Sequence, residues 1–164
     1  MPKRSEHNDE LDLELLRILR EDGRVSLTDL AQKLRISRAN AYARLGGLRR
    51  RGVIQGFSAV VDHARLGLGM TAIVLLSTGS QGRFRWRELR RGLDLLPEVE
   101  YAALVTGTAD VLVLVRTASQ EELRRLLLEK LQGLPHVTST LTLTVLDEIV
   151  KRPFVLPWPG PDQR

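Results

Sequence analysis

The sequence predicts an α+β protein in which an N-terminal helix-turn-helix unit precedes a C-terminal ferredoxin-like domain of βαββαβ order. Apolar residues recur at helical spacing over residues 9–54. Residues 70–150 instead read as strand, helix, strand, strand, helix and strand, which is the element order of a ferredoxin-like sheet. The 164 residues are enough for two small domains, and we expect the boundary between them within residues 55–69.

The composition is that of a folded protein with a mild basic excess. Hydrophobic residues make up 43% of the chain and charged residues 27%, which argues against a disordered chain, and the net charge of +5 favours an acidic partner. The absence of cysteine excludes disulfides, thiolate metal sites and cysteine nucleophiles. The first ten residues lack the apolar core of a signal peptide, and no apolar run reaches the about 18 residues of a membrane helix, so we expect a soluble cytoplasmic protein.

The first predicted helix starts at Asp9, stops at Gly23 and packs behind a pair of shorter helices. Ser26 and Ser37 each precede a run of helical spacing, and a serine hydroxyl there accepts a hydrogen bond from the first helical turn. The pair, joined by residues 35–36, is therefore a helix-turn-helix. The expected core residues are Leu11, Leu15, Ile18, Leu19, Leu27, Leu30, Ala31, Leu34, Ala41, Leu45 and Leu48.

The second helix of the pair is basic. From Arg35 to Arg51 the chain has basic residues and no acidic one, so a polyanion meets no local repulsion there. This pattern is typical of DNA-binding helices, although an ordinary helix pair with a solvated basic face fits it equally well.

The residues opposite the core of this helix predict how it would read DNA. Asn40 is suited to adenine, Arg38 to guanine or a phosphate, and the alanines to thymine methyl groups. Ser37 and the helix N-terminus suit a phosphate, and the other arginines suit the DNA backbone, whereas Arg44 points towards the core and is expected to be structural. The predicted DNA-binding residues are Arg24, Ser37, Arg38, Ala39, Asn40, Tyr42, Ala43, Arg49, Arg50 and Arg51.

The second half of the chain predicts a sheet with both helices on one face. Residues 55–69 are predicted as a hinge strand and linker, because residues 53–61 alternate and residues 62–69 are rich in turn formers. Ser119 and Glu122 form a capping box for the last helix. The predicted strands are residues 71–78, 99–107, 110–117 and 137–146, and the predicted helices are residues 83–96 and 119–134.

The uncovered face of this sheet is predicted to pack on a second copy of the domain. Strands 71–78 and 110–117 are apolar at both parities, which a solvent-exposed face does not explain. In the last strand we expect the leucines to face the helices and the alternating threonines to line the dimer face or a small-molecule crevice; a β-branched edge strand explains that row equally well. Residues 151–164, with four prolines, predict an extended tail, either loose or docked on a neighbouring subunit through Phe154 and Trp158.

Four short motifs and the distances between them along the chain are specific enough to indicate a family. They are Asp22-Gly23-Arg24, Ile36-Ser37, residues 52–57, and Gly107 followed by Asp110. Together they resemble the Lrp/AsnC (feast/famine) family of bacterial and archaeal transcription regulators over residues 9–151. The resemblance implies a winged helix-turn-helix, a hinge strand and an effector-binding dimerisation domain. It also implies dimers, frequently assembled into tetramers or octamers, that bind palindromic DNA. The other matching residues are Asp12, Leu15, Leu16, Ser26, Leu30, Ala31, Arg44, Leu45, Leu48, Val61, Asp62, Val105, Thr106, Leu134, Pro135, Val137 and Glu148.

The resemblance further implies a small effector, such as an amino acid, at the loop 106–110. Gly107 lets the backbone approach a ligand, free amides receive a carboxylate, and Asp110 would take the ammonium group. A tight turn with Gly107 at positive φ explains the same residues without a ligand. The predicted effector-binding residues are Thr106, Gly107, Thr108, Ala109, Asp110, Thr140 and Thr142, and neither a cofactor nor a metal is predicted.

The recognition helix departs from the family pattern, and two functions other than an effector-responsive regulator are considered. Gly46 and Gly47 replace the charged pair that family members often carry, so we expect the recognition helix to end or bend early at Gly46. Sirohaem decarboxylases share the architecture, but His7, His63 and His136 form no visible catalytic constellation, and we expect no enzyme. An architectural DNA-binding protein without an effector is the other alternative.

Overall fold

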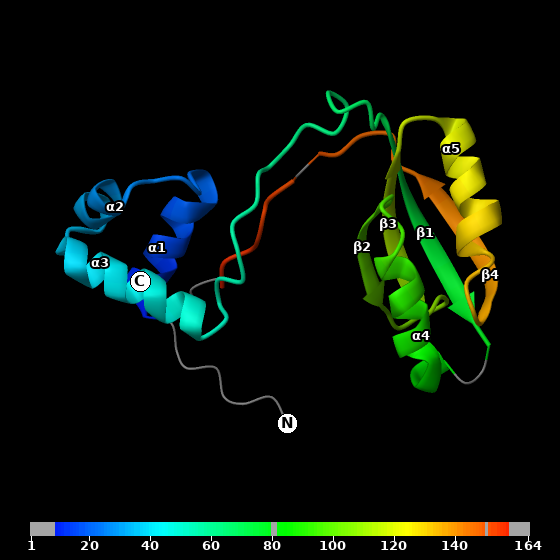
Figure 1. The fold of residues 1–164 in the computed structure, drawn as a ribbon, viewed down its shortest axis with the longest axis horizontal. Helices are drawn as coiled ribbons and strands as arrows, with labels where there is room; N and C mark the ends of the chain where they lie inside the picture. Colours follow the sequence, from blue (N-terminus) through cyan, green and yellow to red (C-terminus); the bar gives the residue numbers. More distant parts are fainter. Residues whose placement is uncertain (1–8, 80–81, 150, 158–164) are drawn as a thin grey trace. The chain divides into compact units, whose positions relative to one another are not determined.

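The computed structural model describes residues 9–79, 82–149 and 151–157, with the side chains of residues 82–85 left out. The chain divides into two compact units (Figure 1). The first contains helices α1 (Glu10–Glu21), α2 (Leu27–Leu34) and α3 (Arg38–Arg50), and the second consists of residues 61–149. No helix in the described ranges is long and apolar enough to cross a membrane. The predicted α+β fold class is confirmed.

The three helices of the first unit enclose one small apolar core. Leu15, Leu30 and Leu48 are almost fully buried at its centre. The Ser26 hydroxyl accepts a hydrogen bond from the Asp29 amide at 3.1 Å, and Ser37 accepts one from Asn40 at 3.2 Å, so both predicted caps are confirmed. Between the caps, Arg35 takes the left-handed conformation with φ 55°, which ends α2 and turns the chain into α3.

Helix α3 runs unbroken through its two glycines, so the prediction that it ends or bends at Gly46 is wrong. A Cβ at Gly46 would lie 3.3 Å from Nη1 of Arg50, and one at Gly47 would lie 3.2 Å from Nη1 of Arg51. The two glycines therefore leave space for the arginines one turn later to lie back along the helix. Packing of Leu48 against α1 and α2 offsets the low helix propensity of glycine.

The predicted hinge strand is not formed in the single chain. Residues 55–61 belong to no helix or strand, because a strand needs a partner with which to exchange backbone hydrogen bonds. Phe57 is 55% exposed and Val60 is 72% exposed, so the apolar side chains of the segment are also largely uncovered.

The second unit is a four-stranded antiparallel sheet covered by helices on one face. Its strands are β1 (Met70–Thr78), β2 (Val99–Leu104), β3 (Val111–Thr117) and β4 (Val137–Thr144), in the spatial order β2-β3-β1-β4. Helix α4 (Gly82–Asp94) joins β1 to β2. Helix α5 (Gln120–Arg125) continues as the π-helix η1 (Leu126–Leu131) before β4. This is the ferredoxin-like order that the sequence predicts.

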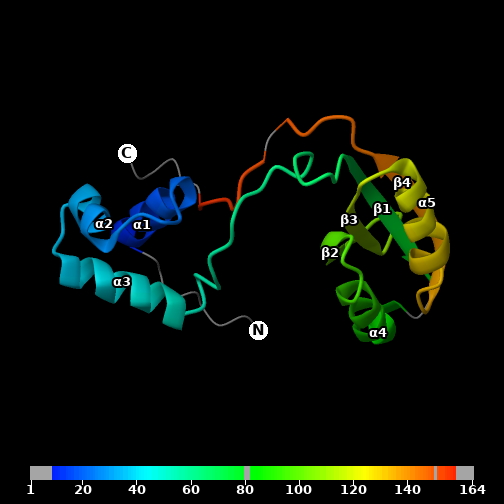
Figure 2. The ribbon, with the colours of Figure 1, turned by 45° about the horizontal axis from the view of Figure 1, so that its top comes forward.

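The core of this unit lies between the sheet and its helices. Figures 1 and 2 show the ribbons of α4 and α5 beside the sheet. Val74 and Val113 from the sheet are fully buried against Leu89 of α4 and Leu126 of η1. The capping box of α5 is confirmed, since the Ser119 hydroxyl accepts from the Glu122 amide at 3.2 Å and the Glu122 carboxylate accepts from the Ala118 amide at 2.9 Å.

The predicted orientation of β4 is wrong. Thr142 pairs with Val74 and Thr140 with Leu76, and cross-strand partners point to the same face, so the threonines lie on the helix-covered side. Leu141, 57% exposed, and Leu143, 48% exposed, lie on the open face. The alternation of this edge strand shows that its leucines share one face, but in this protein that face is the open one.

The C-terminal tail returns to the helical unit. Residues 151–157 contain no helix or strand, as the prolines predict, and Leu156 packs against the core cluster that contains Leu30 and Leu48. Phe154 is 37% exposed, and Trp158 lies outside the described residues.

Candidate DNA interface and effector loop

The predicted DNA-reading residues are all solvent-exposed, although they do not all lie on one side of α3. Ala41 and Leu48 of α3 are fully buried, which turns the opposite side of the helix to solvent. Tyr42, on that side, is 68% exposed. The exposed residues from the predicted set are Arg24, Ser37, Arg38, Ala39, Asn40, Tyr42, Ala43, Arg49, Arg50 and Arg51.

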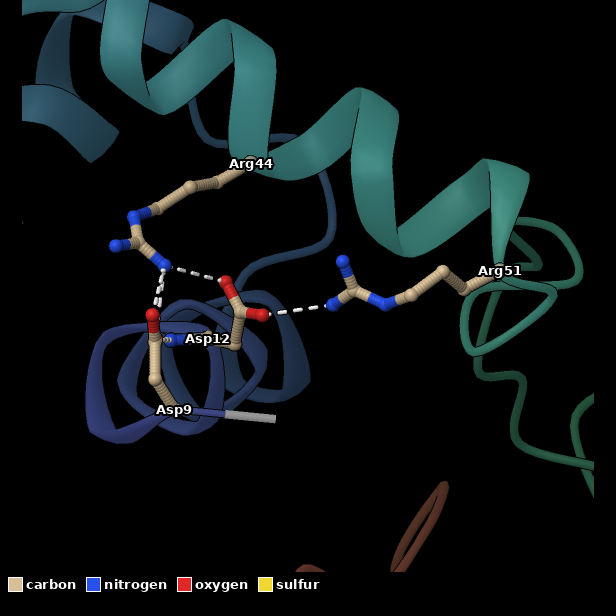
Figure 3. A network of polar contacts seen from close by, with 4 residues as sticks. All are labelled: Asp9, Asp12, Arg44 and Arg51. Atoms are coloured by element: carbon tan, nitrogen blue, oxygen red, sulfur yellow. Dashed lines mark hydrogen bonds and ion pairs between the residues drawn. The ribbon is translucent and has the colours of Figure 1, made fainter. Parts of the chain in front are cut away.

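A polar network fixes the inner side of α3 to α1 (Figure 3). Asp12 is only 5% exposed, and its carboxylate accepts hydrogen bonds from Arg44 at 2.8 Å and from Arg51 at 2.7 Å. Arg44 also donates to the carboxylate of Asp9 at 2.7 Å, while Asp9 caps α1 by accepting from the Asp12 amide. The structural role predicted for Arg44 agrees with these contacts.

The charges in this network reinforce one another. The hydrogen bond from Arg44 is the main reason that the pKa of Asp9 lies below its usual value, and the hydrogen bonds to Asp9 and Asp12 raise the pKa of Arg44. Nε of Arg44 is buried and makes no hydrogen bond within the described ranges. The hydrogen bonds from Nη1 to the two carboxylates therefore stabilise the buried charge of this arginine.

Sequence reasoning missed Asp12 as a network residue and placed Arg51 only on the DNA backbone. The available signal was the position of Asp12, which falls at helical spacing with Leu15, Leu16 and Leu19 on the apolar side of α1. A carboxylate on a buried helix face needs a cationic partner, and the arginines of α3 were the nearest candidates.

The loop 105–110 joins β2 to β3 as a tight turn. Gly107 has φ 138°, a conformation that favours glycine. The Asp110 carbonyl accepts from the Val105 amide at 2.8 Å, and the Asp110 amide donates to the Leu76 carbonyl at 3.0 Å. Oδ2 of Asp110 accepts from both the amide and the hydroxyl of Thr78, at 2.6 and 3.0 Å, which ties the loop to the end of β1.

Thr140 and Thr142 lie apart from this loop, along a groove between β4 and the last helix. The groove has a volume of about 940 Å³. Among the described residues its lining does not include the loop 106–110, so the single chain does not bring the two parts of the predicted effector set into one pocket. Its polar lining includes Gln120, Arg124, Gln132, Thr140, Thr142 and Thr144.

Comparison with known proteins identifies both units. Residues 8–55 match the winged helix-turn-helix DNA-binding family, and residues 71–155, just over half of the chain, match the Lrp/AsnC ligand binding domain. The chain belongs to the Lrp/AsnC family.

Individual relatives agree with this assignment. The proline dehydrogenase transcriptional activator of Rhizobium radiobacter is 32% identical to this chain over 86% of the chain and 90% of the relative. AsnC of E. coli matches with a TM-score of 0.80 at 25% identity, over 89% of this chain and 97% of AsnC. A transcriptional regulator of Neisseria meningitidis in complex with L-Met shares the fold, with a TM-score of 0.83 at 22% identity, over 88% of this chain and 94% of that one.

As a member of the Lrp/AsnC family, the chain is a DNA-binding transcriptional regulator with a ligand-binding domain, and not an enzyme. The sirohaem decarboxylase alternative finds no support among the relatives named above. In the structure, His63 lies 3.6 Å from Glu100 and His136 lies 3.0 Å from Glu88, so these histidines are held in two separate polar contacts.

Within the Lrp/AsnC ligand-binding domain, one buried arginine connects the sheet to the segments that enter and leave it. Arg116 of β3 is 8% exposed and donates to Glu100 of β2, to Thr71 of β1 at 2.7 Å and to Glu148 after β4 at 2.6 Å. Burial would lower the pKa of Arg116, but the hydrogen bonds to Glu100 and Glu148 outweigh it and hold the pKa above its usual value.

Proposed function

We propose that this regulator reads DNA with the exposed face of α3 placed in the major groove. The observation that carries the proposal is the division of α3 into two sides. Asp12 fixes Arg44 and Arg51 on the side towards α1. Ala39 and Ala43 lie opposite the buried Ala41, and Arg38 and Asn40 are also exposed. Slim alanines permit close approach, and Asn40 supplies an amide that can pair with adenine.

We propose further that the protein binds palindromic sites as a dimer formed through the open face of the sheet. This face is apolar on every strand, and monomeric proteins rarely expose a continuous apolar patch of this kind. Identical faces can pack about a two-fold axis, which presents two α3 helices to two half-sites. The open-face residues are Ile73, Leu75, Tyr101, Leu112, Leu114, Leu141 and Leu143.

We propose that the effector is an amino acid bound at the loop 106–110. Both hydrogen bonds from Thr78 end on Oδ2 of Asp110, so Oδ1 can still accept a hydrogen bond from an α-ammonium group. Thr106, Gly107 and Thr108 are exposed, so their backbone is accessible to a carboxylate. The L-Met bound to the Neisseria regulator is a ligand of this class.

We also propose a role for each segment of the chain. Residues 9–54 bind DNA, residues 55–69 connect the domains, residues 70–150 bind the effector and the second subunit, and residues 151–164 form the tail. Further dimers on neighbouring DNA turns would raise affinity by avidity and give tetramers or octamers. Because the protein acts on DNA, we place it in the cytoplasm.

The test is to select binding sites from randomised duplexes with the wild type, Asn40→Ala and Arg49→Gln. We expect Asn40→Ala to lose about 1–3 kcal/mol of discrimination at one position in each half-site. Arg49→Gln should weaken all sequences alike and make the salt dependence shallower by about one phosphate contact in each subunit, or about two in the dimer. Identical selected sites for wild type and Asn40→Ala would contradict the proposed reading face.

A further inference from the structure

Half of the basic residues of the ligand-binding unit lie on one helix. Residues 61–149 contain ten Lys and Arg against eleven Asp and Glu, so the unit as a whole is slightly acidic. Helix α4 alone contains five of these arginines against two acidic residues, Glu88 and Asp94. The rest of the unit therefore has five basic against nine acidic residues, and α4 is a basic element on an acidic domain.

Packing of α4 turns the arginines of its second half to solvent. Leu89 and Leu93 are each 2% exposed and face the sheet, with Trp86 packed beside them. The three arginines with described side chains, Arg87, Arg90 and Arg91, are all exposed. At 100° per residue they fall within an arc of about 100°, so they form one basic face of the helix. In Figure 2 α4 lies on the outside of the sheet, at the lower edge of this unit.

The acidic residues of α4 leave much of this charge uncompensated. Glu88 lies 3.0 Å from His136, on the side towards the start of β4. Asp94 lies 3.7 Å from Arg90, and both side chains are 68% exposed, so solvent screens this pair. Arg87 and Arg91 form no ion pair with any residue in the described part of the chain, and they stand one helical turn, about 6 Å, apart along the axis.

We propose that the arginine face of α4 is a second DNA contact, which binds backbone phosphates of the DNA that flanks the site held by α3. The proposal rests on the DNA-binding function of the helix-turn-helix. A guanidinium group can form two parallel hydrogen bonds to a phosphate. Contacts to backbone phosphates do not depend on the base sequence, so the arginines of α4 could bind any flanking DNA. Once α3 holds its site, the flanking DNA is tethered to the protein, so two or three weak phosphate contacts are enough to retain it.

The experiment compares wild type with the double variant Arg87→Gln/Arg91→Gln on two duplexes that share one recognition site. The short duplex spans only the two half-sites, about 20 base pairs, and the long one adds random flanks on both sides. The matched control is Arg124→Gln/Arg125→Gln, which removes two exposed arginines from α5 instead. Equilibrium binding is measured over a series of salt concentrations, and sedimentation reports the assembly state of each variant.

We expect the α4 variant to bind the short duplex like wild type. On the long duplex its affinity should fall roughly tenfold near 0.1 M salt. The slope of log K against log salt should become shallower by about 4, because the dimer loses two phosphate contacts in each subunit and each contact accounts for about one unit. The control variant should bind both duplexes like wild type.

Three results would overturn the proposal. They are unchanged binding of the α4 variant to the long duplex, equal losses on both duplexes, and a changed assembly state that accounts for the loss. Retained DNA binding with loss of binding to an acidic protein partner would instead assign the face to that partner. Failure of the wild type to bind the short duplex would contradict the DNA-reading function itself, which the other outcomes leave intact.

Discussion

Asp12 shows how one carboxylate can organise a DNA-binding domain. It occupies a buried position on α1, yet its two oxygens bind arginines seven residues apart on α3 and its C-terminal cap. The two hydrogen bonds hold α3 at a fixed rotation against α1. The residues that we propose to read DNA are exposed on the same helix, so this rotation would decide which of their side chains reach the groove.

We predict that Asp12→Asn destabilises the helical unit by about 2 kcal/mol, because Arg44 and Arg51 would each lose a charged hydrogen-bond acceptor that is buried between the helices. Arg44 would keep its hydrogen bond to Asp9, so it loses one of its two carboxylate partners. Chemical denaturation measures the loss, and hydrogen exchange of the α1 and α3 amides locates it.

The control for this substitution is Glu14→Gln, also on α1. Glu14 pairs with Arg17 on the exposed surface, and such pairs contribute little, so the change should stay below about 0.5 kcal/mol. Equal stability of the Asp12 and Glu14 variants would show that the network does not hold the helices together.

At the scale of the element, the sequence predicts the helices and strands well because their signals are local. The serines at 26, 37 and 119 cap the helices they precede, and the strands follow their apolar runs. The failures concern what an element meets in space. The spacing of Leu141 and Leu143 predicts that β4 alternates, but it does not predict which face of β4 the helices cover. Gly46 predicts a break in the helix, because the sequence does not show that the Arg50 side chain packs beside it.

The site could be predicted to a similar extent. The exposed side of α3 follows from the period of its apolar residues, and the turn at Gly107 follows from residue type. The bonds of Arg51 to Asp12 and of Asp110 to Thr78 join residues more than 30 positions apart, and spacing along the chain carries no signal for them.

The tail is an element whose role comes only from its packing. Leu156 extends the small core of α1, α2 and α3, and a three-helix core is marginal on its own. We predict that Leu156→Ala destabilises the helical unit by about 1 kcal/mol through lost apolar burial. Thermal unfolding measures the effect. The control, Leu146→Ala, removes a side chain that is 95% exposed and should change nothing; an equal effect of both substitutions would argue against docking of the tail.

In the whole molecule, the dimer that we propose depends on the open face of the sheet. We predict that Leu143→Lys converts the dimer to a monomer, because a two-fold axis would bury the new charge twice in an apolar interface. Thr144→Lys, one residue later on the helix-covered side, should leave the dimer intact. Sedimentation distinguishes these outcomes, and a dimer that survives Leu143→Lys would place the interface elsewhere.

The most direct test of an effector-responsive DNA-binding regulator is its binding to the DNA upstream of its own gene. An unrelated duplex of equal length is the control, and both are measured at fixed salt with and without a pool of amino acids. We predict that the upstream DNA binds more tightly and that the pool changes its affinity or pattern, since a ligand acts through its differential affinity for two states. Equal binding of both duplexes, unaffected by the pool, would contradict an effector-responsive regulator and favour an architectural DNA-binding protein.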